Sequence, residues 1–269
     1  MKCLLFLCLS VLSLVAKEVK TSAYIDVKET ETATQLRTAN ITYSRGGQKV
    51  TLFGAIHIAD KNYYKTLNEQ FTRCDVVLFE MVGGEALEGR QPAAAGADPE
   101  ADPTFQVLST LYDGYAQSLD LSSQTVEIDY TAKNFVHADL SLEEYLKLTE
   151  EKGGSLVGLA LALQSEGEKP NMARMLNAML TKNSNALKRS MVGMMAGAGK
   201  ANALIGETVI IGDRNQAAFD VLDAELAKGH QHIGIFYGAA HLADMNDRLS
   251  EMGFTKVSGT WNTAWYIAK

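Results

Sequence analysis

The chain has 269 residues, of which 46% are hydrophobic and 21% are charged, and its formal net charge at pH 7 is -7. A chain of this length can bury a full core as one domain or as two small ones. The acidic balance argues against nucleic acid as a partner, because phosphate binding needs a basic face and the sequence shows none.

The first residues are typical of an export signal. Met1 and Lys2 precede the apolar run CLLFLCLSVLSLVA, which is too short to span a bilayer as a helix. Small residues at Ala16 and Ala23 offer two cleavage sites. We therefore expect a signal peptide over residues 1–23 and a secreted or periplasmic protein with no other membrane span, the alternative being an uncleaved N-terminal anchor.

Cysteine usage and motif searches exclude several kinds of chemistry. Cys3 and Cys8 lie within the signal, so the mature chain keeps Cys74 alone. An internal disulfide and a cysteine-based metal site are therefore excluded. The sequence also has no Gly-x-Ser-x-Gly elbow, phosphate loop or dinucleotide fingerprint, so serine nucleophiles and nucleotide binding have no support.

The first half of the mature chain predicts a hairpin followed by a strand, a helix and a strand. Apolar and polar residues alternate from about residue 33 to 55, with a turn at Gly46 and Gly47. Asp60 stands where a helix N-cap is expected, and CDVVLFE, ending at Glu80, indicates a buried strand. We expect the strands around the helix to be parallel neighbours joined by a right-handed crossover. The helix is marked by apolar residues at helical spacing, Tyr64, Leu67 and Phe71.

The middle of the chain predicts a cap over this sheet. Residues 83–103, rich in Pro, Gly, Ala and acidic residues, indicate a flexible loop, and about 104–205 a mainly helical insertion. Within the insertion, SQTVEIDYTAKNFVHADLS suggests an extended segment, and Ser141 with Glu144 has capping-box spacing. Methionines recur here and indicate either helix packing or an adaptable binding surface: Met172, Met175, Met179, Met191, Met194 and Met195.

The last portion repeats the plan of the first. IGIFYGAAHLADMNDRLSEMGFTKVSG predicts a strand, a helix capped by Asp244 and a second strand, and TWNTAWYIAK predicts a final hairpin on the sheet edge. The expected fold class is therefore α/β (α+β), in which residues 24–269 form a single domain. Its central mixed sheet is built from two strand–Gly-x-x-His–helix–strand units, with the helical insertion as a cap.

The two units share the motif Gly-Ala-x-His-x-Ala-Asp, in FGAIHIAD at 53–60 and YGAAHLAD at 237–244. Gly54 and Gly238 stand at strand ends, and His57 and His241 follow three residues later. If the units pair side by side, both histidines and the strand-end Glu80 converge at one edge of one sheet. Two histidines and a carboxylate are a common ligand set for a divalent ion in hydrolysis. The alternative is histidines satisfied by packing in duplicated turns.

Three segments resemble the TraB, GumN and Tiki superfamily: VTLFGAIHIADKNYYKTLNEQFTRCDVVLFE, GDRN at 212–215 and IGIFYGAAHLADM. That superfamily is marked by two Gly-x-x-His motifs, an acid ending the strand after the first, and an Arg-Asn pair before the second. The resemblance spans most of residues 40–267. Tiki proteins look like metal-dependent proteases that use Mn or Co, and the resemblance implies the same activity here. The TraB branch is associated with shutting down peptide pheromones.

Carried over by position, the resemblance assigns His57, His241 and Glu80 as metal ligands and Arg214 and Asn215 as substrate contacts. From its chemistry alone, Arg214 either holds a substrate oxygen or forms a salt bridge to Glu80, and Asn215 is otherwise a cap or turn residue.

Further polar residues receive weaker assignments. His137, just before a helix start, is a candidate catalytic residue in the same cleft, or else a structural histidine. Many superfamily members have Glu before the Arg-Asn pair, whereas this chain has the shorter Asp213. His230 and His232 flank a strand entrance and indicate a solvated edge.

The function expected from these residues is that of an exported metal-dependent hydrolase, a peptidase of the TraB and Tiki type, with Mn, Co or Zn as cofactor. Its substrate would be a peptide or a small molecule. Two alternatives stay open: a protein that binds a peptide or glycan in the same cleft without turnover, and a metal-independent esterase with a His/Glu site.

Overall fold

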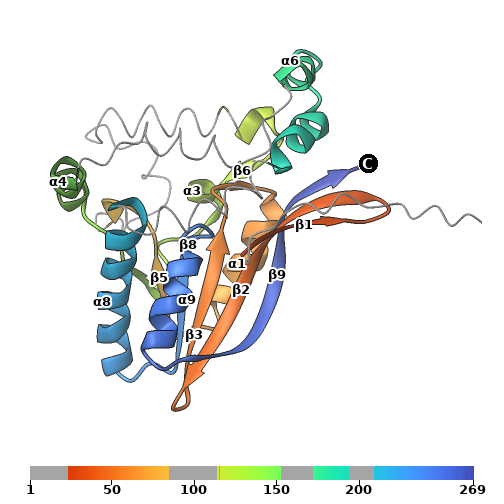
Figure 1. The fold of residues 1–269 in the computed structure, drawn as a ribbon. Coiled ribbons are helices and arrows are strands. Elements are labelled where there is room, and N and C mark those ends of the chain that lie inside the picture. The colour runs from red at the N-terminus through yellow and green to blue at the C-terminus, as the bar shows by residue number, and fades with distance from the viewer. Residues whose placement is uncertain (1–23, 85–113, 115, 153–171, 194–208) are drawn as a thin grey trace, which may run out of the picture.

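The structure is a computed structural model that describes residues 24–84, 114, 116–152, 172–193 and 209–269. The predicted signal peptide and nearly all of the predicted 83–103 loop lie outside these ranges. The described residues form a mixed α/β fold around a seven-stranded sheet (Figure 1). Its strands are β1 (Ile25–Glu29), β2 (Ala33–Arg45), β3 (Gln48–Ala55), β5 (Val76–Phe79), β7 (Phe135–His137), β8 (His232–Gly238) and β9 (Thr255–Ala268).

One half of the sheet is antiparallel and is organised by the long strand β2. β1 and β3 share one edge of β2, and β9 pairs with the other edge from Ala33 to Ser44. The turn between β2 and β3 falls at Gly46 and Gly47, both with positive φ, as predicted. The predicted final hairpin is wrong: residues 255–268 form one continuous strand, because the long β2 offers a partner along its whole length.

The other half is parallel, in the order β3-β8-β5-β7. The two motif strands are direct neighbours, with Ala55 opposite Gly238. The expectation that β3 and β5 are neighbours is wrong, since β8 lies between them. The right-handed crossover rule fixes the hand of a connection but not how many strands it passes over. β8, whose last six residues are all buried, takes the central place.

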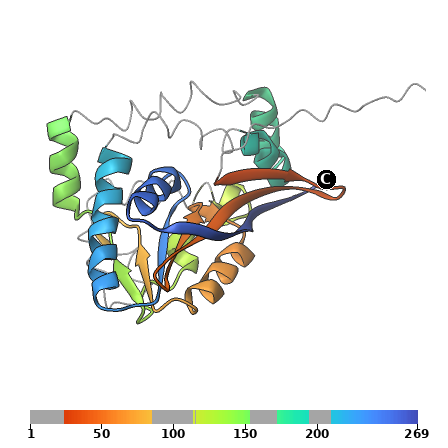
Figure 2. The same ribbon diagram turned by 60° about the horizontal axis from the view of Figure 1, so that its bottom comes forward.

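Helices cover both faces of the parallel half (Figure 2). α1 (Lys61–Phe71) packs on one face against Phe53, Phe79 and Phe236. α8 (Arg214–Ala227) and α9 (Leu242–Glu251) pack on the other. This second core contains Leu52, Leu78 and Ile235 among its strand residues. Because successive side chains point to opposite faces, strands buried on both sides are apolar throughout.

The middle of the chain contributes both strand and helix. β6 (Ser122–Ser123) pairs with β4 (Ile58–Ala59), and we call this pair the β4–β6 ribbon. The segment expected to be extended begins instead with one helical turn, α3 (Gln124–Glu127), and is extended only at β7. The helices described here include α4 (Leu142–Lys152), α6 (Met172–Leu180), a helix over residues 184–193, and the π-helix η3 (Val209–Asp213).

The sequence predicted three helix caps, at Asp60, at Asp244 and at Ser141 with Glu144, and the structure treats each of them differently. Asp60 is the N-cap residue of α1, although its side chain makes no capping hydrogen bond. Asp244 is not a cap, because α9 begins at Leu242 with His241 at the N-cap position. The capping box of Ser141 and Glu144 is present. Met194 and Met195 lie outside the described residues. No helix within the described ranges is both long and apolar enough to cross a bilayer.

Gly54 of the first motif stands where the chain comes closest to neighbouring backbone. A Cβ there would lie 2.9 Å from the carbonyl oxygen of Ala39 and 3.2 Å from Leu242 Cδ2. Tyr63 also donates a 2.7 Å hydrogen bond to the carbonyl oxygen of Gly54. This glycine therefore permits close packing of β3 on β2 and α9.

Gly54→Ala should lower the free energy of unfolding by about 1–3 kcal/mol, because backbone cannot move aside for the added methyl group. Gly259→Ala is the matched control, since its nearest neighbours lie 3.8 Å away on an exposed part of β9. Urea unfolding of both variants measures the difference. Equal stability of the two would contradict the close-packing role of Gly54.

Candidate functional site

The carboxyl ends of the four parallel strands each deliver one polar side chain. His57 follows β3, His241 follows β8, Glu80 comes directly after β5, and Asp139 follows β7. Parallel strands end at one edge of a sheet, where ligand sites of α/β folds form. The sequence predicted this gathering for His57, His241 and Glu80.

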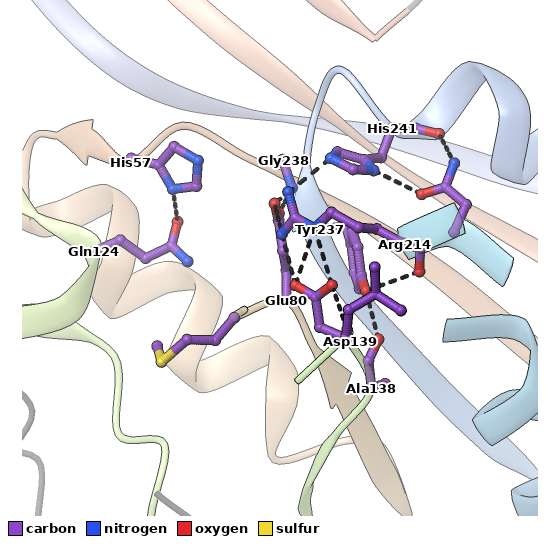
Figure 3. A network of polar contacts seen from close by, with 12 residues as sticks. His57, Glu80, Gln124, Ala138, Asp139, Arg214, Tyr237, Gly238 and His241 are labelled. Atoms are coloured by element: carbon purple, nitrogen blue, oxygen red, sulfur yellow. Dashed lines mark hydrogen bonds and ion pairs between the residues drawn. The ribbon is translucent and has the colours of Figure 1, made fainter. Parts of the chain in front are cut away.

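Arg214, the first residue of α8, lies between two of these carboxylates (Figure 3). Its Nη2 donates to Glu80 Oε1 at 2.7 Å and to Asp139 Oδ2 at 2.6 Å. Its Nε donates to Asp139 Oδ1 at 2.9 Å, so the contact with Asp139 is bidentate. The side chains of Arg214, Glu80 and Asp139 are 12%, 7% and 0% exposed, which makes this a buried charge cluster.

The cluster keeps Glu80 ionised. Burial alone would raise the pKa of Glu80, but the charges of Arg214, His241 and His57 and the hydrogen bond from Gly238 N–H lower it to about 2. That N–H donates to Glu80 Oε2 at 2.5 Å. Burial raises the pKa of Asp139, with Arg214 opposing it. One guanidinium therefore compensates two carboxylates with net negative charge left over.

The second motif histidine is held in one tautomer. Asn215 Nδ2 donates to Asp244 Oδ2 at 2.7 Å, so its Oδ1 is the atom that faces His241 Nδ1, at 2.6 Å. An amide oxygen only accepts hydrogen bonds, so Nδ1 of His241 carries the proton. Burial lowers the pKa of His241 to about 4, although Glu80 opposes this. At neutral pH His241 is thus uncharged, with a lone pair on Nε2.

That lone pair faces a carboxylate. His241 Nε2 lies 3.5 Å from Glu80 Oε1, and in this neutral tautomer no hydrogen atom stands between them. The ring of Tyr237 packs edge-on against His241, with centroids 5.1 Å apart. The Tyr237 hydroxyl donates to the carbonyl oxygen of Ala138, which joins β8 to the loop that holds Asp139.

The first motif histidine has a similar amide partner but a different setting. His57 Nδ1 lies 3.2 Å from Gln124 Oε1, and Gln124 Nε2 donates to Tyr130 at 2.8 Å. His57 is exposed, whereas His241 is 4% exposed. Figure 3 shows His57 and Gln124 standing apart from the network around Glu80. Among the described residues, no group of three His, Cys, Asp or Glu side chains is close enough together to hold a metal ion.

Of the other residues that the sequence singled out, one joins the site and two lie outside it. Asn215 joins the site as the orienting partner of His241, with its side chain fully buried. His137 lies 2.7 Å through Nε2 from the carbonyl oxygen of Met81 and packs on Phe79, so the structure engages it beside the cluster and not in it. His232 lies at the opposite end of β8, where its Nε2 contacts Thr51 at 2.8 Å.

Two residues of the site escaped the sequence reasoning. Asp139 belongs to it because β7 pairs with β5, yet a strand of three residues leaves almost no periodic signal. The one indication in the sequence was its position directly after FVHA at residues 135–138, which is mostly apolar. Gln124 gives no sequence signal for its role, because it approaches His57 only through the β4–β6 ribbon.

No family model matches the chain, and the searches found neither a curated protein nor a solved structure that is significantly similar to it. The resemblance to the TraB, GumN and Tiki superfamily therefore stays a prediction. The arrangement of the site rests on the geometry described above.

Arg214→Met should destabilise the protein by about 3–5 kcal/mol, because it leaves two buried carboxylates without their cation. The control Lys61→Met removes an exposed partner that lies 3.8 Å from Glu127, and should cost less than about 1 kcal/mol. Denaturant unfolding at neutral pH gives both values. A cost for Arg214→Met no greater than that of the control would show that the cluster does not hold the strand ends together.

Proposed function

We propose that this chain is an exported metal-dependent hydrolase that acts on peptides, with His57, His241 and Glu80 as ligands of a divalent Mn, Co or Zn ion. The localisation rests on the signal-like sequence of residues 1–23. The peptide substrate rests on the resemblance to the Tiki and TraB proteins. The support for the metal comes from the geometry of His241 and Glu80.

The observation that carries the proposal is the pair of lone-pair atoms facing each other across 3.5 Å, Nε2 of His241 and Oε1 of Glu80. Two such atoms repel unless a cation lies between them. Ligands at roughly 2.1 Å from a tetrahedral ion stand about 3.4 Å apart, so this pair fits a shared metal. His57, the third member, fits less closely, because it lies outside a ligand cluster in this structure.

The amide partners of the two histidines also suit metal ligation. A metal-bound histidine usually gives its second N–H to an oxygen atom, which fixes its tautomer and orientation. Asn215 Oδ1 does so for His241, and Gln124 Oε1 stands in the same relation to His57. A divalent ion held there would supply Lewis acidity, which acidifies water and polarises a carbonyl group.

The remaining residues have roles of their own toward a substrate. Nε and Nη2 of Arg214 are occupied by Asp139 and Glu80. Its Nη1 makes no hydrogen bond within the described residues and is the donor left for a substrate carbonyl oxygen. Gly238 leaves room next to Glu80, since a Cβ there would lie 3.3 Å from Oε2. Glu80, whose pKa is lowered to about 2, is ionised at neutral pH, as a carboxylate ligand of a cation must be.

One observation favours the metal-independent esterase. Arg214 already neutralises Glu80 through Oε1, the same oxygen atom that faces His241. A His/Glu site of this kind would act without an ion. The two functions differ in their response to chelators, and a protein that only binds its ligand would show no turnover in either case.

The decisive experiment measures metal content after dialysis and thermal shift with added Mn, Co and Zn. We expect about one tight ion per chain and a rise in Tm with metal, because binding to the folded state stabilises it. His57→Ala and His241→Ala should each abolish both effects. His230→Ala is the matched control, since this histidine pairs with Glu225 just before β8, at the opposite end of that strand from the second motif.

Peptide hydrolysis should then stop with a chelator and return with the ion. Turnover that ignores chelators, in a protein without metal, would replace this proposal with the metal-independent esterase. Metal binding that survives both motif variants would reject the assigned ligands.

A separate prediction concerns the amide that orients His241. Asn215→Ala leaves every proposed ligand in place but should weaken metal affinity by about 10–100-fold, because Nδ1 loses its fixed partner. The control is Gln216→Ala, one residue on, whose side chain contacts Asp220 and Arg248 at the surface. Titration of the metal-free variants with Zn gives both affinities, and unchanged affinity in Asn215→Ala would remove the orienting role.

A further inference from the structure

A depression of about 740 Å³ lies at the N-terminus of α1, beside the β4–β6 ribbon and apart from the cluster of Glu80, Asp139 and Arg214. It is lined by the beginning of that helix, the end of β9 and the helix over residues 184–193. Asp60, Lys61, Lys188 and Tyr266 are among its lining residues. A volume of this size is typical of pockets that hold small molecules.

Lys188 is the unusual residue of this pocket. It is 4% exposed, a degree of burial that lysine almost never shows without a close partner. Its Nζ makes no hydrogen bond within the described ranges, and its ion partner, Asp60 Oδ1, is 3.7 Å away. A buried ammonium with three donors is therefore left with one distant carboxylate. Because the Nζ atom is not among the fully buried atoms that lack a partner, it opens to solvent in the pocket, where a carboxylate can reach it.

The beginning of α1 adds a second set of unsatisfied donors. The first N–H groups of a helix have no intrahelical acceptors, and a capping side chain usually accepts from one of them. Asp60 occupies the N-cap position but makes no capping hydrogen bond. Its carboxylate instead accepts from the backbone N–H of Tyr266 at 2.6 Å. The first two residues of this 11-residue helix, Lys61 and Asn62, line the pocket, and a helix N-terminus favours an anion.

We infer that this pocket binds the carboxylate group of a small organic acid or short peptide, with Lys188 as its ion partner and the α1 N-terminus as its hydrogen-bond donor. The charged side chains lining the pocket balance, Lys61 and Lys188 against Asp60 and Asp120. A singly charged carboxylate suits this balance better than a doubly charged phosphate, which the two aspartates would repel. The inference does not depend on the metal site.

The test uses acetate, glycylglycine and inorganic phosphate as probes of the purified protein, with affinities from chemical-shift titration. Acetate and glycylglycine should bind, and phosphate should bind more weakly than both. Lys188→Met should weaken glycylglycine binding by about tenfold or more, as the loss of a charge-assisted hydrogen bond does. The control is Lys65→Met, which removes an exposed lysine one turn after Lys61 on α1. Lys65 does not line the pocket, so the affinity should stay unchanged.

A second variant reverses the sign of the effect. Asp60→Asn keeps an acceptor for the N–H of Tyr266 but removes the carboxylate that competes for Lys188, so glycylglycine should bind several-fold more tightly. This readout stands even if Lys188→Met fails to fold. The inference is overturned if neither carboxylate binds, if Lys188→Met binds as the parent does, if Asp60→Asn weakens binding, or if phosphate is the preferred probe.

Discussion

The site depends on one buried guanidinium placed across two strand ends. Glu80 and Asp139 follow neighbouring parallel strands, and two carboxylates buried side by side repel each other unless a cation lies between them. Arg214 supplies that cation from the first turn of α8, so the ion pairs also fix where this helix meets the sheet edge. Asn215, the next residue, is thereby placed where its amide holds His241. The tautomer of His241 is therefore coupled, through Asn215, to the salt bridges that the preceding residue Arg214 makes.

That His57, His241 and Glu80 lie along one edge could be predicted from the sequence without the strand order. All parallel strands of one sheet end at the same edge, but this does not bring the side chains into one cluster, and His57 stands apart from the other two. The order itself was not predictable, because an apolar strand such as β8 fits between β3 and β5 as well as beside them. The same limit hid Asp139: a strand of three residues has too few positions to show a period.

The two copies of the motif differ more than their sequences suggest. Each histidine has an amide oxygen near Nδ1, yet His241 is buried within the charge cluster and His57 is exposed beside the β4–β6 ribbon. The backbone after the glycine differs as well: residues 239–241 form a turn that leads directly into α9, whereas the chain after Ala55 bends at His57 and continues into β4. Burial depends on what covers each histidine, which for His241 is α8 with its Arg-Asn pair. A local motif therefore predicts where the backbone of a residue lies at the sheet edge, but not the environment of its side chain.

The second unit has no strand-end acid that corresponds to Glu80, and its last strand lies on the other side of the motif strands β3 and β8 from β5. β5, the second strand of the first unit, ends beside β8 and places Glu80 next to His241. β9, the second strand of the other unit, pairs with β2 and runs parallel to β3, so it also ends at the carboxyl edge but on the far side. The residues at that end, among them Tyr266, line the pocket of Lys188 instead. One sheet edge thus carries two polar sites, because the last strands of the two units lie on opposite sides of the motif strands β3 and β8.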